Sequence, residues 1–262
     1  MMSHWKNRHI RPYLVAWIGI LGLVIGLAST AGAQQDTTRI LFVGNSFTYF
    51  YNLPQVVAAM AREQGVVLLT RQSTVGGSSL EQHWKGEKGT QTRTLLESAN
   101  WDYVVFNNHS TSAIDSPDSF LEYGRKFADL TRQRGAKPIF MMTWAYASNP
   151  LMQPAITAGY LQLATATQAA YVPAGLLFAE ARKWRPDLDL FFDDKHPSSN
   201  GTYLLGLAFA KYFTGKVTTG IPPRLTTTDR DGEKLYLLFM KEEDAAFLQQ
   251  LVDDFDFDLN KD

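Results

Sequence analysis

The stretch ILFVGNS at residues 40–46 decides the fold that this sequence predicts. Its first four residues are all apolar, which is typical of a short strand that a parallel sheet buries on both faces. A Gly-Asn-Ser turn follows the strand at once, and in such a turn the hydroxyl of Ser46 can be exposed at the end of the strand. We therefore expect a buried first strand with a candidate nucleophile at its carboxyl end.

Apolar runs and amphipathic stretches alternate along the rest of the chain, which is the pattern of a parallel sheet covered by helices. No internal repeat, low-complexity block or long linker interrupts it. The predicted fold class is α/β, a three-layer α/β/α sandwich around five parallel strands. We expect these strands at residues 40–43, 66–69, 103–106, 138–142 and 171–173, and helices at 54–63, 92–98, 120–134, 155–170, 176–184, 200–213 and 242–252.

Polar residues and glycines follow each of the first three predicted strands. Ser46 follows the first strand, Gly76 and Gly77 follow the second, and Asn107 and Asn108 follow the third. In open parallel sheets, ligands bind beyond the carboxyl ends of the strands. We therefore expect these five residues to lie on one rim of the sheet.

The first 33 residues have the features of a secretory signal peptide. Three basic residues precede an apolar run at residues 14–28, and Ala31, Gly32 and Ala33 then offer small residues for cleavage. The apolar run is short for a bilayer span, which needs about 20 residues. We therefore expect cleavage near Ala33, no stable membrane anchor afterwards, and a secreted or periplasmic protein.

Cleavage there leaves 262 − 33 = 229 residues, which suits one domain with a full-sized core. We expect residues 34–262 to form this single domain. Its core should span about residues 39–213, and a C-terminal helical extension should continue to residue 262.

The composition excludes several classes of function. The chain has no cysteine, which excludes a disulfide framework, a cysteine nucleophile and a lipid-modified N-terminus. It has 25 Lys and Arg against 26 Asp and Glu, and the first 33 residues hold three of the basic ones, so 22 − 26 gives a net charge of −4 afterwards. This balance gives no electrostatic reason to expect nucleic-acid binding. The lack of cysteine and the scattered histidines argue against a zinc site, so we expect neither a metal nor a cofactor.

A serine hydroxyl becomes a good nucleophile only when a base takes its proton. After residue 33 the sequence offers only His83, His109 and His196 as histidine bases. His196 follows Asp193 by three positions in the stretch DDKHP, so a tight turn can bring this carboxylate to the imidazole and fix its tautomer. We therefore predict Ser46 as the nucleophile, His196 as the base and Asp193 as the orienting acid.

Plainer interpretations exist for these residues. The DDKHP stretch can be a surface loop with acidic residues beside a histidine, and Asp194 is a competing carboxylate. His109 could touch the site, but a polar residue at a strand end needs no function, and we expect His83 to pack at the surface. Aromatic residues crowd the nucleophile, and we favour packing under the rim over shaping of a pocket for Phe47, Tyr49, Phe50 and Tyr51.

An oxyanion that forms during acyl transfer needs hydrogen-bond donors fixed in place. The Gly76–Gly77 pair lets the backbone approach a ligand closely, because neither residue carries a Cβ. Asn107 or Asn108 could add a side-chain amide. The alternatives are a plain tight turn for the glycines and capping of a strand end for the asparagines.

On four stretches the chain resembles the SGNH (GDSL-like) hydrolases, a family of esterases, lipases and carbohydrate deacetylases named for Ser, Gly, Asn and His in separate blocks. These stretches are VGNSFT at residues 43–48, VGGSS at 75–79, VFNNH at 105–109 and DDKHP at 193–197. Asn45 stands where the family name has Asp, and the third block lacks the usual Gly-x-Asn-Asp. Asn107 and Asn108 therefore both remain candidates for the family's asparagine.

The resemblance implies a flavodoxin-like α/β/α sandwich with five parallel strands. It also implies a catalytic set of Ser46, Asp193 and His196, and an oxyanion hole formed by the backbone amides of Ser46 and Gly77 with the side chain of Asn107. No GxSxG elbow of the α/β-hydrolase type surrounds the serine.

Together these observations predict a secreted serine ester hydrolase that acts through an acyl-enzyme on an acylated carbohydrate or another small ester. Two alternatives remain. One is a lipase or acylhydrolase that acts on longer acyl esters, and the other is a non-catalytic glycan-binding module that retains the fold.

Overall fold

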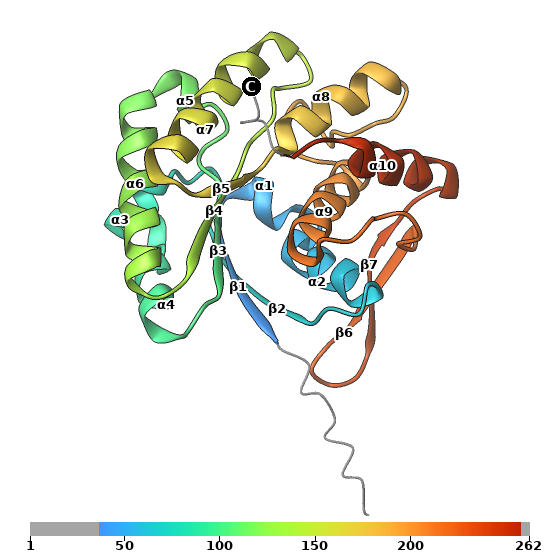
Figure 1. Cartoon of the computed structure of the whole chain (residues 1–262), viewed down its shortest axis with the longest axis horizontal. Coiled ribbons are helices and arrows are strands. Elements are labelled where there is room, and N and C mark those ends of the chain that lie inside the picture. The colour runs from blue at the N-terminus through green and yellow to red at the C-terminus, as the bar shows by residue number, and fades with distance from the viewer. Residues whose placement is uncertain (1–36, 258–262) are drawn as a thin grey trace, which may run out of the picture. The chain divides into compact units, whose positions relative to one another are not determined.

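A five-stranded parallel sheet forms the centre of the structure, a computed structural model that describes residues 37–257 (Figure 1). The strand order is β2-β1-β3-β4-β5, and every neighbouring pair is parallel. This confirms the predicted sheet. The strands are β1 (Thr38–Gly44), β2 (Leu68–Thr74), β3 (Tyr103–Phe106), β4 (Lys137–Met141) and β5 (Ala170–Val172).

The apolar run of β1 serves two separate cores. Alternate side chains of a strand point to opposite faces of the sheet, so Ile40 and Phe42 join one buried cluster whereas Leu41 and Val43 join the other. All four are fully buried. This double burial is the reason that the first strand is apolar at every position.

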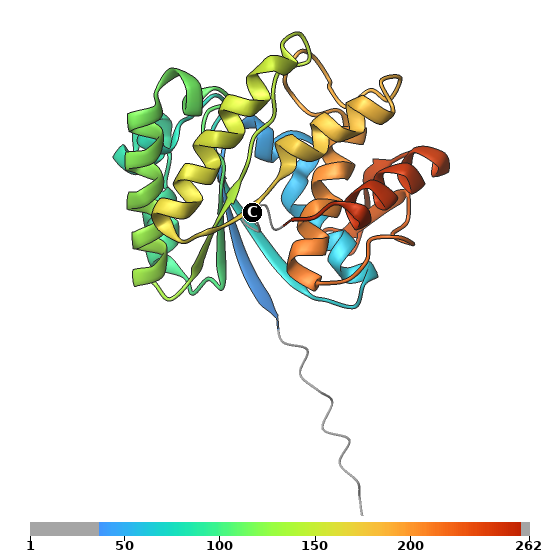
Figure 2. The ribbon, with the colours of Figure 1, turned by 45° about the horizontal axis from the view of Figure 1, so that its top comes forward.

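Helices cover both faces of the sheet and complete the three-layer sandwich (Figures 1 and 2). The first cluster includes side chains of α2 (Leu53–Glu63), α8 (Ala174–Trp184), α9 (Ser199–Thr214) and α10 (Glu242–Asp254). The second cluster includes side chains of α3 (Leu80–Lys85), α4 (Thr92–Ser98), α6 (Pro117–Gln133) and α7 (Gln153–Thr167). Shorter helical segments are α1 (Ser46–Tyr49), η1 (Phe50–Asn52), η2 (Glu87–Gly89), α5 (Ser112–Asp115) and η3 (Pro150–Met152).

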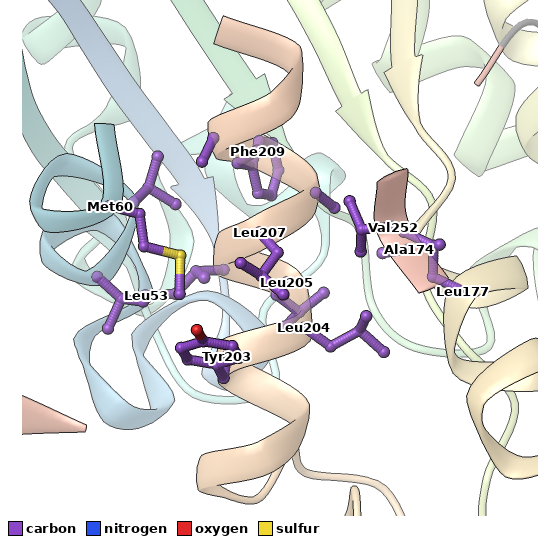
Figure 3. Packing of buried hydrophobic residues seen from close by; sticks show 14 of the residues in the cluster. Leu53, Met60, Ala174, Leu177, Tyr203, Leu204, Leu205, Leu207, Phe209 and Val252 are labelled. Carbon is purple, nitrogen blue, oxygen red and sulfur yellow. The ribbon is translucent and has the colours of Figure 1, made fainter. Parts of the chain in front are cut away.

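Helix α9 is the main support of the first cluster. Figure 3 shows its side chains, among them Leu204 and Phe209, packed with Met60 of α2 and Leu177 of α8. Phe209 also meets Phe42 of β1 edge to face, with ring centroids 5.5 Å apart. Because α9 begins directly after the loop that carries His196, this packing fixes the position of that loop relative to β1.

The second strand begins later than the predicted range 66–69. The backbone N–H of Val66 still bonds to the carbonyl of Ala61, as part of the turn that ends α2 with Gly65 at a φ of 76°. The strand then runs on through polar residues to Thr74. An edge strand such as β2 can keep polar side chains in solvent, so its sequence lacks the continuous apolar signal of β1.

We predict a helical extension after residue 213, but the segment after α9 also contains two strands. An antiparallel hairpin of β6 (Arg224–Thr228) and β7 (Lys234–Phe239) precedes α10. Its turn is held by the carboxylate of Asp229, which accepts hydrogen bonds from the backbone N–H groups of Asp231 and Glu233. Gly232 has a φ of 89° in this turn, a conformation that favours glycine.

The predicted signal peptide falls on residues 1–33, which lie outside the described residues. Between residues 37 and 257, no helix has both the length and the apolar character that a membrane crossing requires.

Candidate active site

The candidate nucleophile is placed by a capped helix at the carboxyl end of β1. Asn45 is the N-cap of α1, and its side-chain oxygen accepts a hydrogen bond from the backbone N–H of Phe47. Ser46 is the first residue of this helix, where a backbone N–H has no acceptor within the helix. The hydroxyl and the backbone N–H of Ser46 are therefore both held at the helix N-terminus.

The structure brings Ser46, His196 and Asp193 into one hydrogen-bonded chain. The Oγ of Ser46 lies 2.9 Å from the Nε2 of His196, across 150 residues of sequence. The Nδ1 of His196 lies 2.7 Å from the Oδ2 of Asp193. These three side chains thus have the distances of a nucleophile, a base and an orienting acid.

The loop that carries His196 is closed on itself. The Oδ1 of Asp193 accepts hydrogen bonds from the backbone N–H groups of Lys195 and His196, both at 2.8 Å. At the base of the loop, the backbone N–H of Phe192 donates to the carbonyl of His196, also at 2.8 Å. The competing carboxylate, Asp194, instead accepts two hydrogen bonds from Ser148.

The charge of Asp193 is stabilised by this loop. Desolvation opposes the charged form, but hydrogen bonds from the backbone N–H and imidazole of His196 and from the backbone N–H of Lys195 outweigh it. They hold the pKa of Asp193 well below its ordinary value. Asp193 is therefore an anion at neutral pH and can accept the N–H of the imidazole.

Aromatic rings fix the plane of the His196 imidazole. Phe50 stacks on it with ring centroids 4.4 Å apart and planes at 7°, and Phe47 meets it edge to face at 5.9 Å. Phe47 in turn stacks on Trp144, whose indole N–H donates to the carbonyl of Lys195. The rings thus tie the nucleophile helix to the histidine loop.

We expected the aromatic residues near Ser46 to pack under the rim of the sheet. This holds for Phe47 but not for all of the others. Phe47 is 2% exposed, whereas Tyr51 is 39% exposed. Tyr49 and Phe50 line a cavity of about 420 Å³ that Ser46 also lines. The other lining residues are Asn45, Phe47, Gly76, Gly77, His109, Ser110, Lys195 and His196.

Gly77 lines this cavity with a φ of 62°, in the left-handed region that glycine adopts most readily. A Cβ at this position would meet no atom within 4 Å, so the backbone conformation rather than space explains the glycine. Gly76, its neighbour in the same lining, is close to the hydroxyl of Tyr49. The turn after β2 thus brings backbone to the cavity wall, as we predicted.

Asn107 does not point into this cavity, contrary to our expectation. Its side-chain N–H groups donate to the Oδ1 of Asn45 and to the carbonyl of Asn108, and its Oδ1 accepts from the hydroxyl of Thr48. The residue is 1% exposed. Because both amide hydrogens are used inside the protein, Asn107 has no donor left for an oxyanion.

Asn108 does not line the cavity either. Its Oδ1 accepts hydrogen bonds from the backbone N–H groups of Leu80 and His109, and the residue is 3% exposed. Asn45 completes the network, because its Nδ2 donates to the carbonyls of Ser78 and Asn108. The three asparagines therefore join the turns after β1, β2 and β3, and of the three only Asn45 also lines the cavity.

We predicted that His83 packs at the surface, but the structure buries it. Its Nε2 lies 2.9 Å from the carbonyl of Gly44 and 2.8 Å from the Oγ of Ser78, and its Nδ1 lies 2.6 Å from the hydroxyl of Thr92. Burial lowers the pKa of His83 to about 4 although the bond to Gly44 opposes this. The neutral ring thus supports the turn that precedes Ser46.

In residues 37–257, no group of three or more His, Cys, Asp or Glu side chains is arranged to hold a metal ion. The chemistry that the site itself offers is that of a hydroxyl nucleophile with a histidine base, beside backbone N–H groups.

Neither a protein-family model nor a curated protein matches the chain. Solved structures do resemble it. A candidate SGNH hydrolase from Slackia heliotrinireducens is 23% identical, with a TM-score of 0.58 over 68% of this chain and 100% of that chain. A DUF4886 family protein from Bacteroides uniformis is 19% identical, with a TM-score of 0.67 over 83% of this chain and 93% of that chain.

A third similar structure is a variant of an acetyl-xylooligosaccharide esterase from Geobacillus Stearmophilus. It is 17% identical, with a TM-score of 0.52 over 66% of this chain and 93% of that chain. These comparisons show that the chain has the fold of SGNH/GDSL-like hydrolases, in agreement with the resemblance in the sequence motifs.

Proposed function

We propose that this chain is a secreted serine ester hydrolase that acts through an acyl-enzyme on an acylated carbohydrate or another small ester. The observation that carries the proposal is the hydrogen-bonded chain from Ser46 through His196 to Asp193, which opens into a cavity. The fold shared with hydrolases supports the same reaction class. Localisation outside the cytoplasm rests on the signal-like residues 1–33 alone.

The first half of the reaction forms the acyl-enzyme. The Nε2 of His196 accepts the proton of Ser46 while the Oγ attacks the ester carbonyl carbon, which becomes tetrahedral. The backbone N–H groups of Ser46 and Gly77 stabilise the oxyanion. The intermediate then collapses, the bond to the alcohol oxygen breaks, and the imidazolium of His196 protonates the leaving alcohol.

The second half repeats these steps with water. His196 accepts a proton from water as the hydroxide oxygen attacks the acyl carbon on Ser46. Collapse of the second tetrahedral intermediate returns the proton to Ser46 and releases the carboxylic acid. Throughout, Asp193 accepts the Nδ1–H of His196 and so keeps Nε2 available as the base.

An ester between a short acyl group and a hydroxyl of a sugar suits the site best. Ligand cavities in proteins commonly hold about 300–1,000 Å³, and the cavity of about 420 Å³ lies near the lower end of this range. The similar structure from Geobacillus Stearmophilus is a variant of an acetyl-xylooligosaccharide esterase. We therefore place acetylated carbohydrates ahead of long-chain acyl esters as substrates.

Hydrolysis assays test the proposal. The purified protein should hydrolyse p-nitrophenyl acetate and acetylated xylooligosaccharides faster than p-nitrophenyl palmitate, and Ser46→Ala should abolish all turnover without lowering the unfolding midpoint. The matched control is Ser98→Ala, because Ser98 is an exposed residue at the end of α4, before β3. Full turnover by Ser46→Ala would reject the mechanism, and glycan binding without turnover would identify a binding module.

A further inference from the structure

The oxyanion site lacks the side-chain donor that the sequence motifs imply. The Nδ2 of Asn107 donates at 3.0 Å to Asn45 and at 2.9 Å to the carbonyl of Asn108, so both of its hydrogens are used. The backbone N–H of Asn107 still bonds to the carbonyl of Val43 at 3.0 Å, which extends the pairing between β1 and β3. This pairing keeps the Asn107 side chain in the interior.

His109, two residues further along, occupies the wall of the cavity. It lines the cavity together with Ser46, Gly77 and His196. Its backbone is fixed, because its N–H donates to the Oδ1 of Asn108 at 2.8 Å and its carbonyl accepts from the N–H of Ser112 at 3.0 Å. The side chain is therefore presented to the cavity by a rigid support.

The imidazole of His109 has no hydrogen-bond partner among the residues that the structure describes. Among residues 37–257, no recorded hydrogen bond or ring contact involves its side chain, and no carboxylate is bonded to it. His196, by contrast, bonds to both Ser46 and Asp193. His109 thus lacks the partners of a general base but retains two ring nitrogens for a ligand.

The surroundings of His109 favour the neutral ring. Burial lowers its pKa, and the positive charges of Lys195 and Lys88 add to this effect whereas Asp115 opposes it. A neutral imidazole carries one N–H donor. At neutral pH the ring can therefore donate a hydrogen bond without adding a positive charge beside His196.

We infer that His109 is a catalytic residue whose ring N–H donates the third hydrogen bond to the oxyanion, beside the backbone N–H groups of Ser46 and Gly77. The inference rests on the proposed function, because it assigns a donor to the tetrahedral intermediate of that reaction. A developing negative charge at this wall would meet three donors from the turns after β1, β2 and β3.

The test compares His109→Ala and His109→Gln with the unmodified protein on p-nitrophenyl acetate. Loss of one oxyanion donor costs about 10²–10³ in turnover. We expect His109→Ala to lower kcat by about this factor with little change in KM, and His109→Gln, which keeps an N–H donor, to recover part of the loss. Both variants should keep the unfolding midpoint, because the ring has no recorded partner in the described residues.

An alkylboronic acid, which forms a tetrahedral adduct with an active serine, provides a second readout. Its affinity should fall in His109→Ala in parallel with kcat. A kcat within twofold of the unmodified value, or an effect on KM alone, would overturn the inference. The proposed function has its own test, because it fails if Ser46→Ala retains turnover. If Ser46→Ala is inactive but His109→Ala is fully active, the role of His109 is rejected and the proposed function stands.

Discussion

Acid should destabilise this fold through the buried imidazole of His83. The residue is 1% exposed, and both ring nitrogens already have partners, the carbonyl of Gly44 with the hydroxyl of Ser78 on one side and the hydroxyl of Thr92 on the other. Because Nε2 donates to the carbonyl, Nδ1 must accept from Thr92. A second proton would break that arrangement, and burial lowers the pKa of His83 from 6.5 to about 4.

The sign and size of the effect follow from proton binding. Between pH 6.5 and pH 4 the unfolded chain binds a proton at this ring that the folded protein does not, so stability falls as the pH falls through this window. The full shift corresponds to about 3 kcal/mol. About 2 kcal/mol of it should be lost between pH 7 and pH 5.

Urea unfolding of the unmodified protein and of His83→Gln at these two pH values measures the effect. Glutamine can donate to the carbonyl of Gly44 but cannot titrate. The loss of unfolding free energy between pH 7 and pH 5 should be about 2 kcal/mol larger in the unmodified protein. Contributions of other groups, including His109, occur in both proteins and cancel in this difference. Equal losses in the two proteins would refute the reasoning.

Two further substitutions test the site. Asn45→Asp keeps the helix cap but removes the donors to the carbonyls of Ser78 and Asn108. It should therefore lower the unfolding free energy by about 2–5 kcal/mol, measured by urea unfolding. A loss below about 0.5 kcal/mol would contradict the role of this network. Asp193→Asn should lower kcat by about 10⁴-fold with little change in the unfolding midpoint, because the amide favours the wrong tautomer of His196. A decrease in the kcat of ester hydrolysis below about tenfold would argue against the orienting role of Asp193.

Much of the fold could be predicted from the sequence because its central strands are buried on both faces. The apolar run of β1 reports that burial directly, and β3 was predicted with its observed bounds at residues 103–106. The hairpin of β6 and β7 was missed although Asp231-Gly232 stands between its strands, a dipeptide typical of hairpin turns. Its exposed strands lack the continuous burial on which the other predictions rested.

The candidate site could likewise be predicted from the sequence only in part. The approach of Ser46 and His196 could be predicted because a strand end and a nearby Asp-x-x-His loop are both short, local patterns. The orientation of Asn107 could not, because it depends on whether the chain leaves the sheet before or after that residue. The bond from its backbone N–H to Val43 shows that it leaves afterwards, and the cavity wall passes to His109.

The central claim is that the hydroxyl of Ser46 is activated by His196. Incubation with a fluorophosphonate probe, followed by mass spectrometry of the peptides, tests it most directly. We predict a single modified peptide that contains Ser46, no labelling of Ser46→Ala, and labelling of His196→Ala that is slower by orders of magnitude. Modification of another serine, or labelling that persists in Ser46→Ala, would contradict the account.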